Sequence, residues 1–213
     1  MEQKNILKTG TTTVGIVCKD GVVLAADKRA TSGHLIASKR AKKVEEISKN
    51  IAVTMAGTVS DAQLLIRLVS SETKLRQMRM GQEVFVKETA NLMARMVYNN
   101  IRKMSMIPGI AHFLMGGKDR EGTHLYEIFA DGSIQDIPDF ISSGSGSVMA
   151  YGVLETMWKP DMSIEEGVTM AVACINAAIQ RDSASGNGID VVTITESGMK
   201  RVINKEITTK IEV

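Results

Sequence analysis

The chain has 213 residues and a mass of 23.1 kDa, enough for one domain with a sizeable core and short of two average domains. Hydrophobic residues make up 44% and charged residues 23%, with 26 Lys and Arg against 24 Asp and Glu. This composition excludes a disordered chain and a protein held to nucleic acid or a membrane surface by a strong positive field. With 4 Phe, 3 Tyr and 1 Trp, aliphatic residues and 14 Met must fill the core.

The two cysteines, Cys18 and Cys174, lie far apart in apolar stretches and belong to no CxxC or metal-ligand pattern. We expect two buried thiols in a reducing compartment. No apolar run reaches the roughly 18 residues that cross a bilayer, and residues 1–10 are too polar for a secretory signal. The sequence therefore predicts a cytoplasmic protein without membrane contact, bound metal or cofactor.

The first third of the chain is typical of strands. Thr12–Cys18 and Val22–Asp27 are rich in β-branched and small apolar residues, and the Asp20-Gly21 pair between them is a hairpin signal. Further strands are expected over His34–Ser38, Val44–Ile47 and Ile51–Ala56, and Gly57 ends the last of them.

Two helices follow. Ser60 and Asp61 offer N-cap chemistry before an apolar face that predicts a helix to about Met80, with Gly81 after it. A second long helix is expected before Pro108-Gly109. Its apolar face comprises Phe85, Leu92, Met93, Met96, Val97, Ile101 and Met104.

The second half repeats the order of strands and helices. Gly116-Gly117 and Asp131-Gly132 are expected to be turns, and Ser142–Ser147 a loop. A short helix through Val153 and Met157 precedes a longer one, whose Ser163-x-x-Glu166 pattern is a capping box. Expected strands are Ala111–Met115, His124–Ala130, Ser133–Ile137, Ile189–Thr195 and Lys200–Ile203. Hairpin-linked strands covered by paired helices predict a layered α+β domain with antiparallel sheets.

Several motifs invite a function and fail closer inspection. Gly144-Ser145-Gly146-Ser147 resembles a phosphate-binding loop, but Met149 stands where a third small residue is needed. The basic run of residues 38–43 is followed by Glu45 and Glu46, so most of it is expected to be a solvated face. His34, His112 and His124 show no metal-ligand spacing and no acidic neighbour in a metal-binding pattern. So few histidines and the lack of a G-x-S-x-G elbow argue against a Ser-His-Asp hydrolase.

The junction at residues 9–15, TGTTTVG, allows two interpretations. It is either a β-branched strand start after a flexible glycine, or a cleavage site between Gly10 and Thr11. A freed α-amine has a pKa of about 7.7–8.0 and can accept the proton of its own residue's hydroxyl. Such chemistry requires neither His nor Cys. Gly10 would help, because a residue without Cβ lets the Thr11 hydroxyl reach the preceding carbonyl.

From Gly10 to about Thr195 the chain resembles proteasome β subunits, and most of all the archaeal type. No single motif decides this, but their combination and order are specific. They are residues 10–15 (GTTTVG), 26–29 (ADKR), 42–43 (KK), 56–57 (AG), 144–147 (GSGS), 151–155 (YGVLE) and 180–186 (QRDSASG).

The resemblance implies the N-terminal nucleophile hydrolase fold, a four-layer αββα sandwich. Residues 1–10 would be a propeptide removed by autocleavage, and residues 11–213 a single domain. Thr11 would be the nucleophile and its freed amine the proton acceptor. Lys43 would stay protonated beside the hydroxyl, and Asp27 would hold its ammonium in place.

The other roles also follow from the resemblance. The Gly57 N–H would stabilise the oxyanion, and Arg29 would support the site. Ser145, Asp182 and Ser185 would surround the Thr11 amine. Substrate backbone would bind as a strand beside Thr31 and Gly57. The pocket for the residue before the cut bond would contain Ala30, Ala41, Met55, Val59 and, less securely, Glu45 and Gln63, which predicts cleavage after hydrophobic residues.

The function implied is a threonine endopeptidase of the 20S proteasome core that degrades unfolded polypeptides inside a closed chamber. Its partners would be α subunits and other β subunits in stacked seven-membered rings, with an AAA ATPase supplying substrate. A catalytically silent structural β subunit is the main alternative, although Thr11, Asp27 and Lys43 are all present. An α-type gate subunit and a small-molecule amidohydrolase fit the motifs less well.

Overall fold

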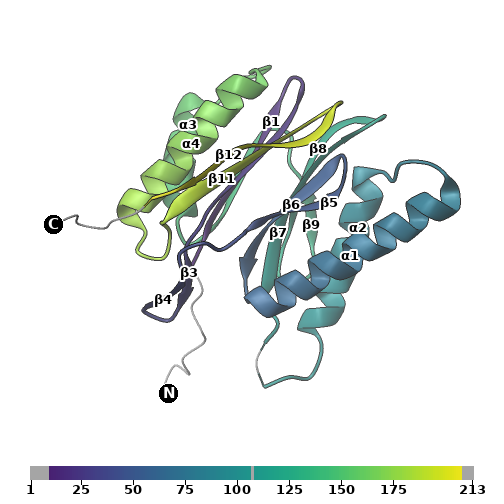
Figure 1. The fold of residues 1–213 in the computed structure, drawn as a ribbon, viewed down its shortest axis with the longest axis horizontal. Helices are drawn as coiled ribbons and strands as arrows, with labels where there is room; N and C mark the ends of the chain where they lie inside the picture. The colour runs from purple at the N-terminus through teal and green to yellow at the C-terminus, as the bar shows by residue number, and fades with distance from the viewer. Residues whose placement is uncertain (1–9, 107, 208–213) are drawn as a thin grey trace.

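The computed structural model describes residues 10–106 and 108–207, which form four layers (Figure 1). Two antiparallel sheets are stacked face to face, one helix pair covers each outer face, and the expected αββα sandwich is confirmed. The helices are α1 (Val59–Met80), α2 (Val86–Ile101), α3 (Ser147–Met157) and α4 (Ile164–Arg181). The first six strands are β1 (Thr12–Cys18), β2 (Gly21–Asp27), β3 (Ala30–Ser32), β4 (Leu35–Ser38), β5 (Val44–Ser48) and β6 (Ile51–Gly57). The others are β7 (Ala111–Asp119), β8 (Gly122–Ile128), β9 (Ile134–Asp136), β10 (Phe140–Gly144), β11 (Gly188–Thr195) and β12 (Gly198–Glu206).

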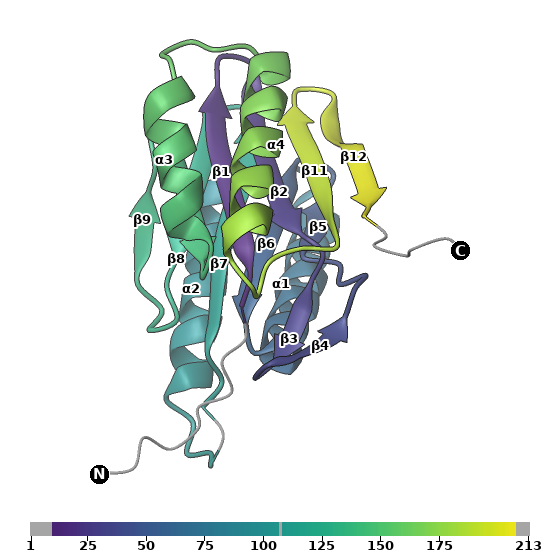
Figure 2. The ribbon, with the colours of Figure 1, turned by 90° about the vertical axis from the view of Figure 1, so that its left-hand side faces the viewer.

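The strand order explains how distant parts of the sequence meet. One sheet has the order β10-β1-β2-β11-β12 and the other β5-β6-β7-β8-β9, with all neighbours antiparallel. The β3–β4 hairpin forms a separate pair near the start of β1, as Figure 2 shows. β1 thus lies between β2, which follows it in sequence, and β10, which is more than 120 residues away, so its first residues are in the interior of a sheet.

Three apolar clusters hold the layers together. One lies between the sheets, around Leu24 and Leu114, and one lies under each helix pair. Cys18 and Cys174 are buried as free thiols in the cluster beneath α3 and α4, as the sequence predicts. Within the described ranges, no helix is long and apolar enough to cross a membrane.

The signals with a specific chemical mechanism are confirmed. The Asp20-Gly21 turn joins β1 to β2. At the start of α4, Ser163 Oγ accepts a hydrogen bond from Glu166 N at 3.2 Å, and Glu166 Oε2 accepts one from Ser163 N at 2.8 Å. Gly81 ends α1 with a φ of 64°, which favours glycine.

The prediction of a turn at Gly116-Gly117 is wrong. Both glycines lie inside β7, where a Cβ on Gly116 would come within 2.7 Å of Val22 Cγ1 in the facing sheet. A Cβ on Gly117 would come equally close, 2.7 Å, to Val86 Cγ2 of α2. These glycines serve close packing between layers, which has the same sequence signature as a turn.

The predicted helix ends are also partly wrong. Thr58, and not Ser60 or Asp61, precedes α1, and its side chain makes no capping bond. The Asp61 carboxylate instead accepts a hydrogen bond from Asn100 Nδ2 at 3.0 Å, which ties α1 to α2. The second helix stops at Ile101, so Met104 lies beyond it and is fully exposed.

Two strands were not expected from the sequence. The short β3 precedes β4, and β10 includes Ser142 and Ser143 from the stretch expected to be a loop. Ser147, at the other end of that stretch, is the first residue of α3. Polar serines carry little strand signal, and the pairing of β10 with β1 supplies what local propensity does not.

Candidate active site

Thr11 lies immediately before β1 and is 6% exposed. Its N–H donates a hydrogen bond to Ser145 Oγ at 3.2 Å, which connects it to the loop between β10 and α3. Gly144 has a φ of 94°, and a Cβ there would lie 2.1 Å from the Thr11 carbonyl oxygen. The glycine-rich loop thus packs directly against the Thr11 backbone.

Asp27 ends β2 and organises the other side of Thr11. Its Oδ1 accepts hydrogen bonds from Lys43 Nζ at 2.6 Å and from Thr12 N at 3.0 Å. Its Oδ2 accepts from the N–H groups of Arg29 and Gly186, each at 2.9 Å. Four donors thus satisfy the hydrogen-bonding capacity of one fully buried carboxylate.

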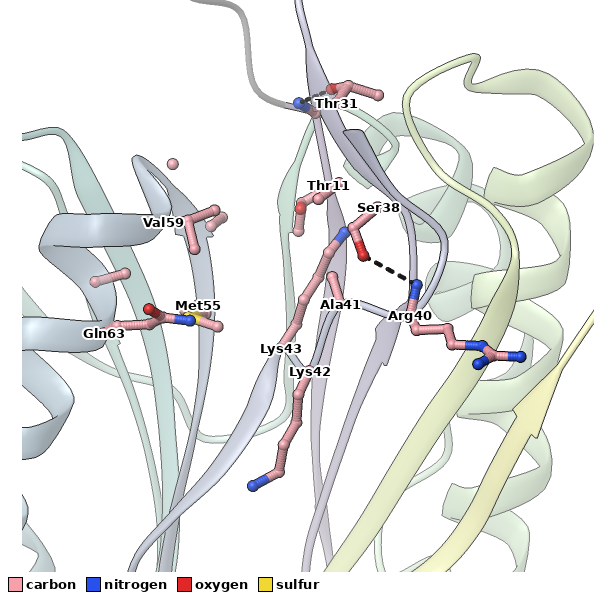
Figure 3. Close-up of a pocket in the computed structure, with 15 residues that line it drawn as sticks. Thr11, Thr31, Ser38, Arg40, Ala41, Lys42, Lys43, Met55, Val59 and Gln63 are labelled. Atoms are coloured by element: carbon pink, nitrogen blue, oxygen red, sulfur yellow. Dashed lines mark hydrogen bonds between the residues drawn. The ribbon is translucent and has the colours of Figure 1, made fainter. Parts of the chain in front are cut away.

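The Lys43 side chain is buried and extends toward Thr11, whereas the neighbouring Lys42 points away (Figure 3). Burial lowers the pKa of the Lys43 ammonium, and the Asp27 carboxylate opposes that effect. The basic run therefore contains one buried lysine among exposed ones, as the resemblance implies. Lys42 pairs with Glu45 at 2.5 Å on the surface.

Ser145, Asp182 and Ser185 form one hydrogen-bond network. Both serine hydroxyls donate to Asp182 Oδ2 at 2.6 Å. Since its single proton goes to Asp182, Ser145 Oγ presents a lone pair to the Thr11 nitrogen. Ser185 Oγ also lies 2.6 Å from Thr12 Oγ1, a contact that the sequence analysis did not anticipate.

A cavity of about 320 Å³ opens in front of Thr11. Ala30, Ala41, Met55, Val59 and Gln63 line it, together with Thr31, as expected for the predicted pocket. Glu45 does not line it. The Glu45 side chain lies in a separate hollow between β5 and α1, so its assignment to the pocket is wrong.

Gly57 lies at the end of β6 and lines the same cavity. Met55 N donates to the Lys43 carbonyl at 3.0 Å, and N–H groups two residues apart point to the same side of a strand. The Gly57 N–H therefore points to the β5 side of the strand, and Gly57 and Thr11 line one cavity. A φ of 105° and a virtual Cβ contact of 2.3 Å with the Ile110 carbonyl oxygen require glycine here.

The family follows from comparison with known proteins. A family model described as "Proteasome subunit" matches residues 7–194. The chain belongs to the proteasome subunit family. Similar proteins named "Proteasome subunit beta" come from Archaeoglobus profundus and Ferroglobus placidus. The first is 47% identical over 199 residues, which cover 93% of this chain and 90% of the relative. The second is 48% identical over 198 residues, which cover 93% of this chain and 92% of the relative.

A third relative of that name, from Methanosarcina barkeri, is 44% identical over 207 residues, 97% of this chain and 96% of its own. The resemblance to archaeal β subunits is thereby confirmed. Proteasome β subunits are components of the 20S core, and the family is in general proteolytic. The buried Lys43–Asp27 pair and the cavity are therefore features of a proteasome-family subunit.

Some surroundings of this proteasome-family site were not predicted. Ser38 and Arg40 also line the cavity, and both residues are exposed, as expected for most of the basic run. Arg40 pairs with Glu206 of β12 at 2.9 Å. The Arg29 guanidinium donates to the Asn187 side chain at 2.8 Å and to the Ser183 carbonyl at 2.7 Å. It thus holds the loop that carries Ser185.

Two histidines have acidic neighbours in space, outside any metal-binding sequence pattern. His112 Nε2 lies 3.0 Å from Glu127 Oε1, and His124 Nε2 lies 3.3 Å from Asp119 Oδ1. These contacts join different strands, so local sequence spacing cannot indicate them. Over residues 10–106 and 108–207, no three His, Cys, Asp or Glu side chains gather in a way that would hold a metal ion.

Proposed function

We propose that the chain is a catalytic β subunit, a threonine endopeptidase, and not a silent structural one. The observation that carries this proposal is the buried Lys43–Asp27 pair beside Thr11 at the end of a cavity. Burying an ion pair costs desolvation free energy. A subunit that only fills a ring would gain no catalytic benefit to offset that cost.

The first reaction would be self-cleavage. Thr11 Oγ attacks the Gly10 carbonyl carbon, the Gly10–Thr11 amide becomes an ester, and water hydrolyses the ester to free the Thr11 amine. Gly10 is fixed for this step, because its N–H donates to Thr31 Oγ1 at 3.0 Å and its Cα packs against Ala184. Residues 1–9 of the proposed propeptide lie outside the described residues.

Turnover would use the same hydroxyl. The freed amine, positioned by Ser145 Oγ, accepts the Thr11 hydroxyl proton, directly or through water, while the Lys43 ammonium stabilises the developing alkoxide. The Gly57 N–H would donate to the tetrahedral oxyanion. The amine of the substrate leaves, and an amine-activated water then hydrolyses the acyl ester and restores Thr11.

The cavity supports a preference for hydrophobic residues before the cut bond. Ala30, Ala41, Met55 and Val59 give it small or apolar walls. The polypeptide backbone would bind alongside Thr31 and Gly57, which makes recognition largely independent of sequence. A long apolar side chain fits such walls without leaving a buried charge unpaired.

The assembly follows from the family. We infer stacked heptameric rings with α subunits, other β subunits completing the ring, and an AAA ATPase that delivers unfolded polypeptide. The cytoplasmic location expected from the sequence stays a prediction.

Coexpression with an α subunit tests the catalytic role. Assembled particles should cleave a peptide with a hydrophobic residue before the scissile bond, and Thr11→Ala should abolish cleavage while leaving assembly intact. Thr11→Ser, which keeps a hydroxyl and an amine, is the matched control and should retain measurable activity. Assembled wild-type particles without Thr11-dependent hydrolysis would support the structural alternative.

A further inference from the structure

Three polar side chains cross the space between the two sheets near Thr11. Ser143 Oγ of β10 lies 2.8 Å from His112 Nδ1 of β7, and Glu127 Oε1 of β8 lies 3.0 Å from His112 Nε2. Ser143 and Glu127 are each 5% exposed. Because β10 belongs to one sheet and β7 to the other, the imidazole joins the sheets.

The ends of this link lie close to the reacting groups. In the second sheet, His112 is directly opposite Ala56, the residue before Gly57. In the first sheet, Ser143 is directly opposite Thr13, two residues after Thr11, and is two residues before Ser145. The link therefore connects the backbone that carries the nucleophile with the backbone that carries the oxyanion donor.

The imidazole is held on several sides. Its ring stacks on Phe129, with centroids 5.1 Å apart and an interplanar angle of 22°. The Nε2 atom is off the line of a good hydrogen bond to Glu127 and has no better-aligned partner among the described residues. The directional bond of the ring is therefore the one to Ser143.

A Ser-His-Glu arrangement could also be interpreted as a second nucleophilic centre. Ser143 Oγ is buried between the sheets, and none of the three residues lines the cavity that contains Thr11. A polypeptide substrate has no access to that hydroxyl. The arrangement fits a positional role better than a catalytic one.

We propose that His112 is a positioning residue, and that the Ser143–His112–Glu127 link sets the spacing between Thr11 Oγ and the Gly57 N–H. This inference rests on the proposed function. Thr11 directly precedes β1 of one sheet and Gly57 ends β6 of the other, so a small slide of one sheet over the other changes their separation. Displacements of about 1 Å can cost about 100-fold in rate. The Lys43–Asp27 bond is a second link across the same gap.

Ser143→Ala tests the link, and Ser142→Ala is its matched control. Ser142 is adjacent, 4% exposed, and donates to the Thr13 carbonyl at 2.9 Å, a bond that stays within one sheet. Each substitution removes one buried hydroxyl and one hydrogen bond. In assembled particles with an α subunit, Ser143→Ala should lower kcat about tenfold with KM within twofold, and Ser142→Ala should stay within twofold of wild type.

A peptide boronate distinguishes positioning from general damage, because its tetrahedral adduct needs both Thr11 Oγ and the Gly57 N–H. Ser143→Ala should weaken boronate inhibition about tenfold and leave binding of a non-reactive peptide amide unchanged. Equal kcat values for the two serine variants, or equal weakening of both ligands, would overturn the inference. Wild-type particles without Thr11-dependent activity would instead refute the proposed function.

If Ser143→Ala does not assemble, two variants of His112 test the positional role instead. The side-chain amide of His112→Asn keeps a polar group at the Nδ1 position, whereas His112→Leu fills the space without one. We expect kcat of the Asn variant to remain within about threefold of wild type and that of the Leu variant to fall about tenfold. Equal kcat values for the two variants would contradict a positional role.

Discussion

Adjacent residues of one type have different environments in this molecule. Lys42 is exposed and pairs with Glu45, whereas Lys43 is buried against Asp27 and extends toward Thr11. Local sequence cannot separate the two, because the difference arises when the end of β2 meets the start of β5. The resemblance to a family selected Lys43, and the geometry gives the physical reason.

Lys43→Met should lower kcat by about 100-fold or more, since it removes the cation beside the attacking hydroxyl. The fold should survive, because Asp27 keeps three backbone N–H donors. Lys42→Met is the matched control and should stay within about twofold, as exposed pairs contribute little. Peptide hydrolysis by assembled particles checks both, and near-normal turnover by Lys43→Met would refute the role assigned to the lysine.

Gly10→Ala should slow removal of the propeptide. A Cβ at Gly10 would lie 1.9 Å from Ala184 Cβ and 2.9 Å from Ser145 Oγ, so the carbonyl under attack has to move. Intact mass measured against time after assembly gives the rate. Adding Ala184→Gly removes the closest contact and should restore part of that rate. Unchanged processing of Gly10→Ala would show that this packing is irrelevant to cleavage.

At the scale of elements, sequence patterns predicted those whose cause is local. The Asp20-Gly21 hairpin, the capping box at Ser163 and the end of α1 at Gly81 each depend on residues within a few positions. The errors have long-range causes. Gly116 and Gly117 are small because other layers press on β7, and β10 forms because β1 pairs with it.

The site shows the same division. Thr11, Asp27, Lys43, Ser145, Asp182 and Ser185 come together as the resemblance implies. The link through His112 could not be predicted, since its three residues belong to three different strands. The basic run is a solvated face at Arg40, as expected, and its pairing with Glu206 could not be predicted because that residue belongs to a distant strand.

Ser163→Ala should destabilise the chain by about 1 kcal/mol, the usual cost of losing an N-cap. The α4 helix contributes Cys174 and Ile175 to a buried cluster, so fraying its first turn affects global unfolding. Urea unfolding followed by circular dichroism measures the change. Ser197→Ala, in an exposed turn, is a control expected to change stability by less than about 0.5 kcal/mol. Equal stability of the two variants would contradict the importance of the cap.

At the scale of the whole molecule, the reactivity of the two buried thiols measures how often the packing beneath α3 and α4 opens. Burial raises the pKa of Cys18 and of Cys174 to about 12, so at pH 8 about one thiol in ten thousand is ionised. A thiol reagent should therefore react with neither cysteine in the folded chain and with both after unfolding in guanidinium. Rapid labelling of the folded protein would show that the layer under α3 and α4 opens easily.

The same shift affects stability against pH. The folded pKa lies above the unfolded value of about 8.5, so the stabilising contribution is complete below that pH and is lost as the pH rises toward 12. The free energy of unfolding should fall between pH 9 and pH 11. A variant with Cys18→Ala and Cys174→Ala should show a shallower fall, and identical slopes would contradict the assignment.

The central claim is that Thr11 becomes the N-terminal residue and carries the chemistry. The most direct measurement is the N-terminal sequence and intact mass of this chain in assembled, peptide-cleaving particles made with an α subunit. The account predicts that the active chain begins at Thr11 and that Thr11→Ala particles retain residues 1–10. Particles that cleave peptides while every copy of the chain still begins at Met1 would contradict it.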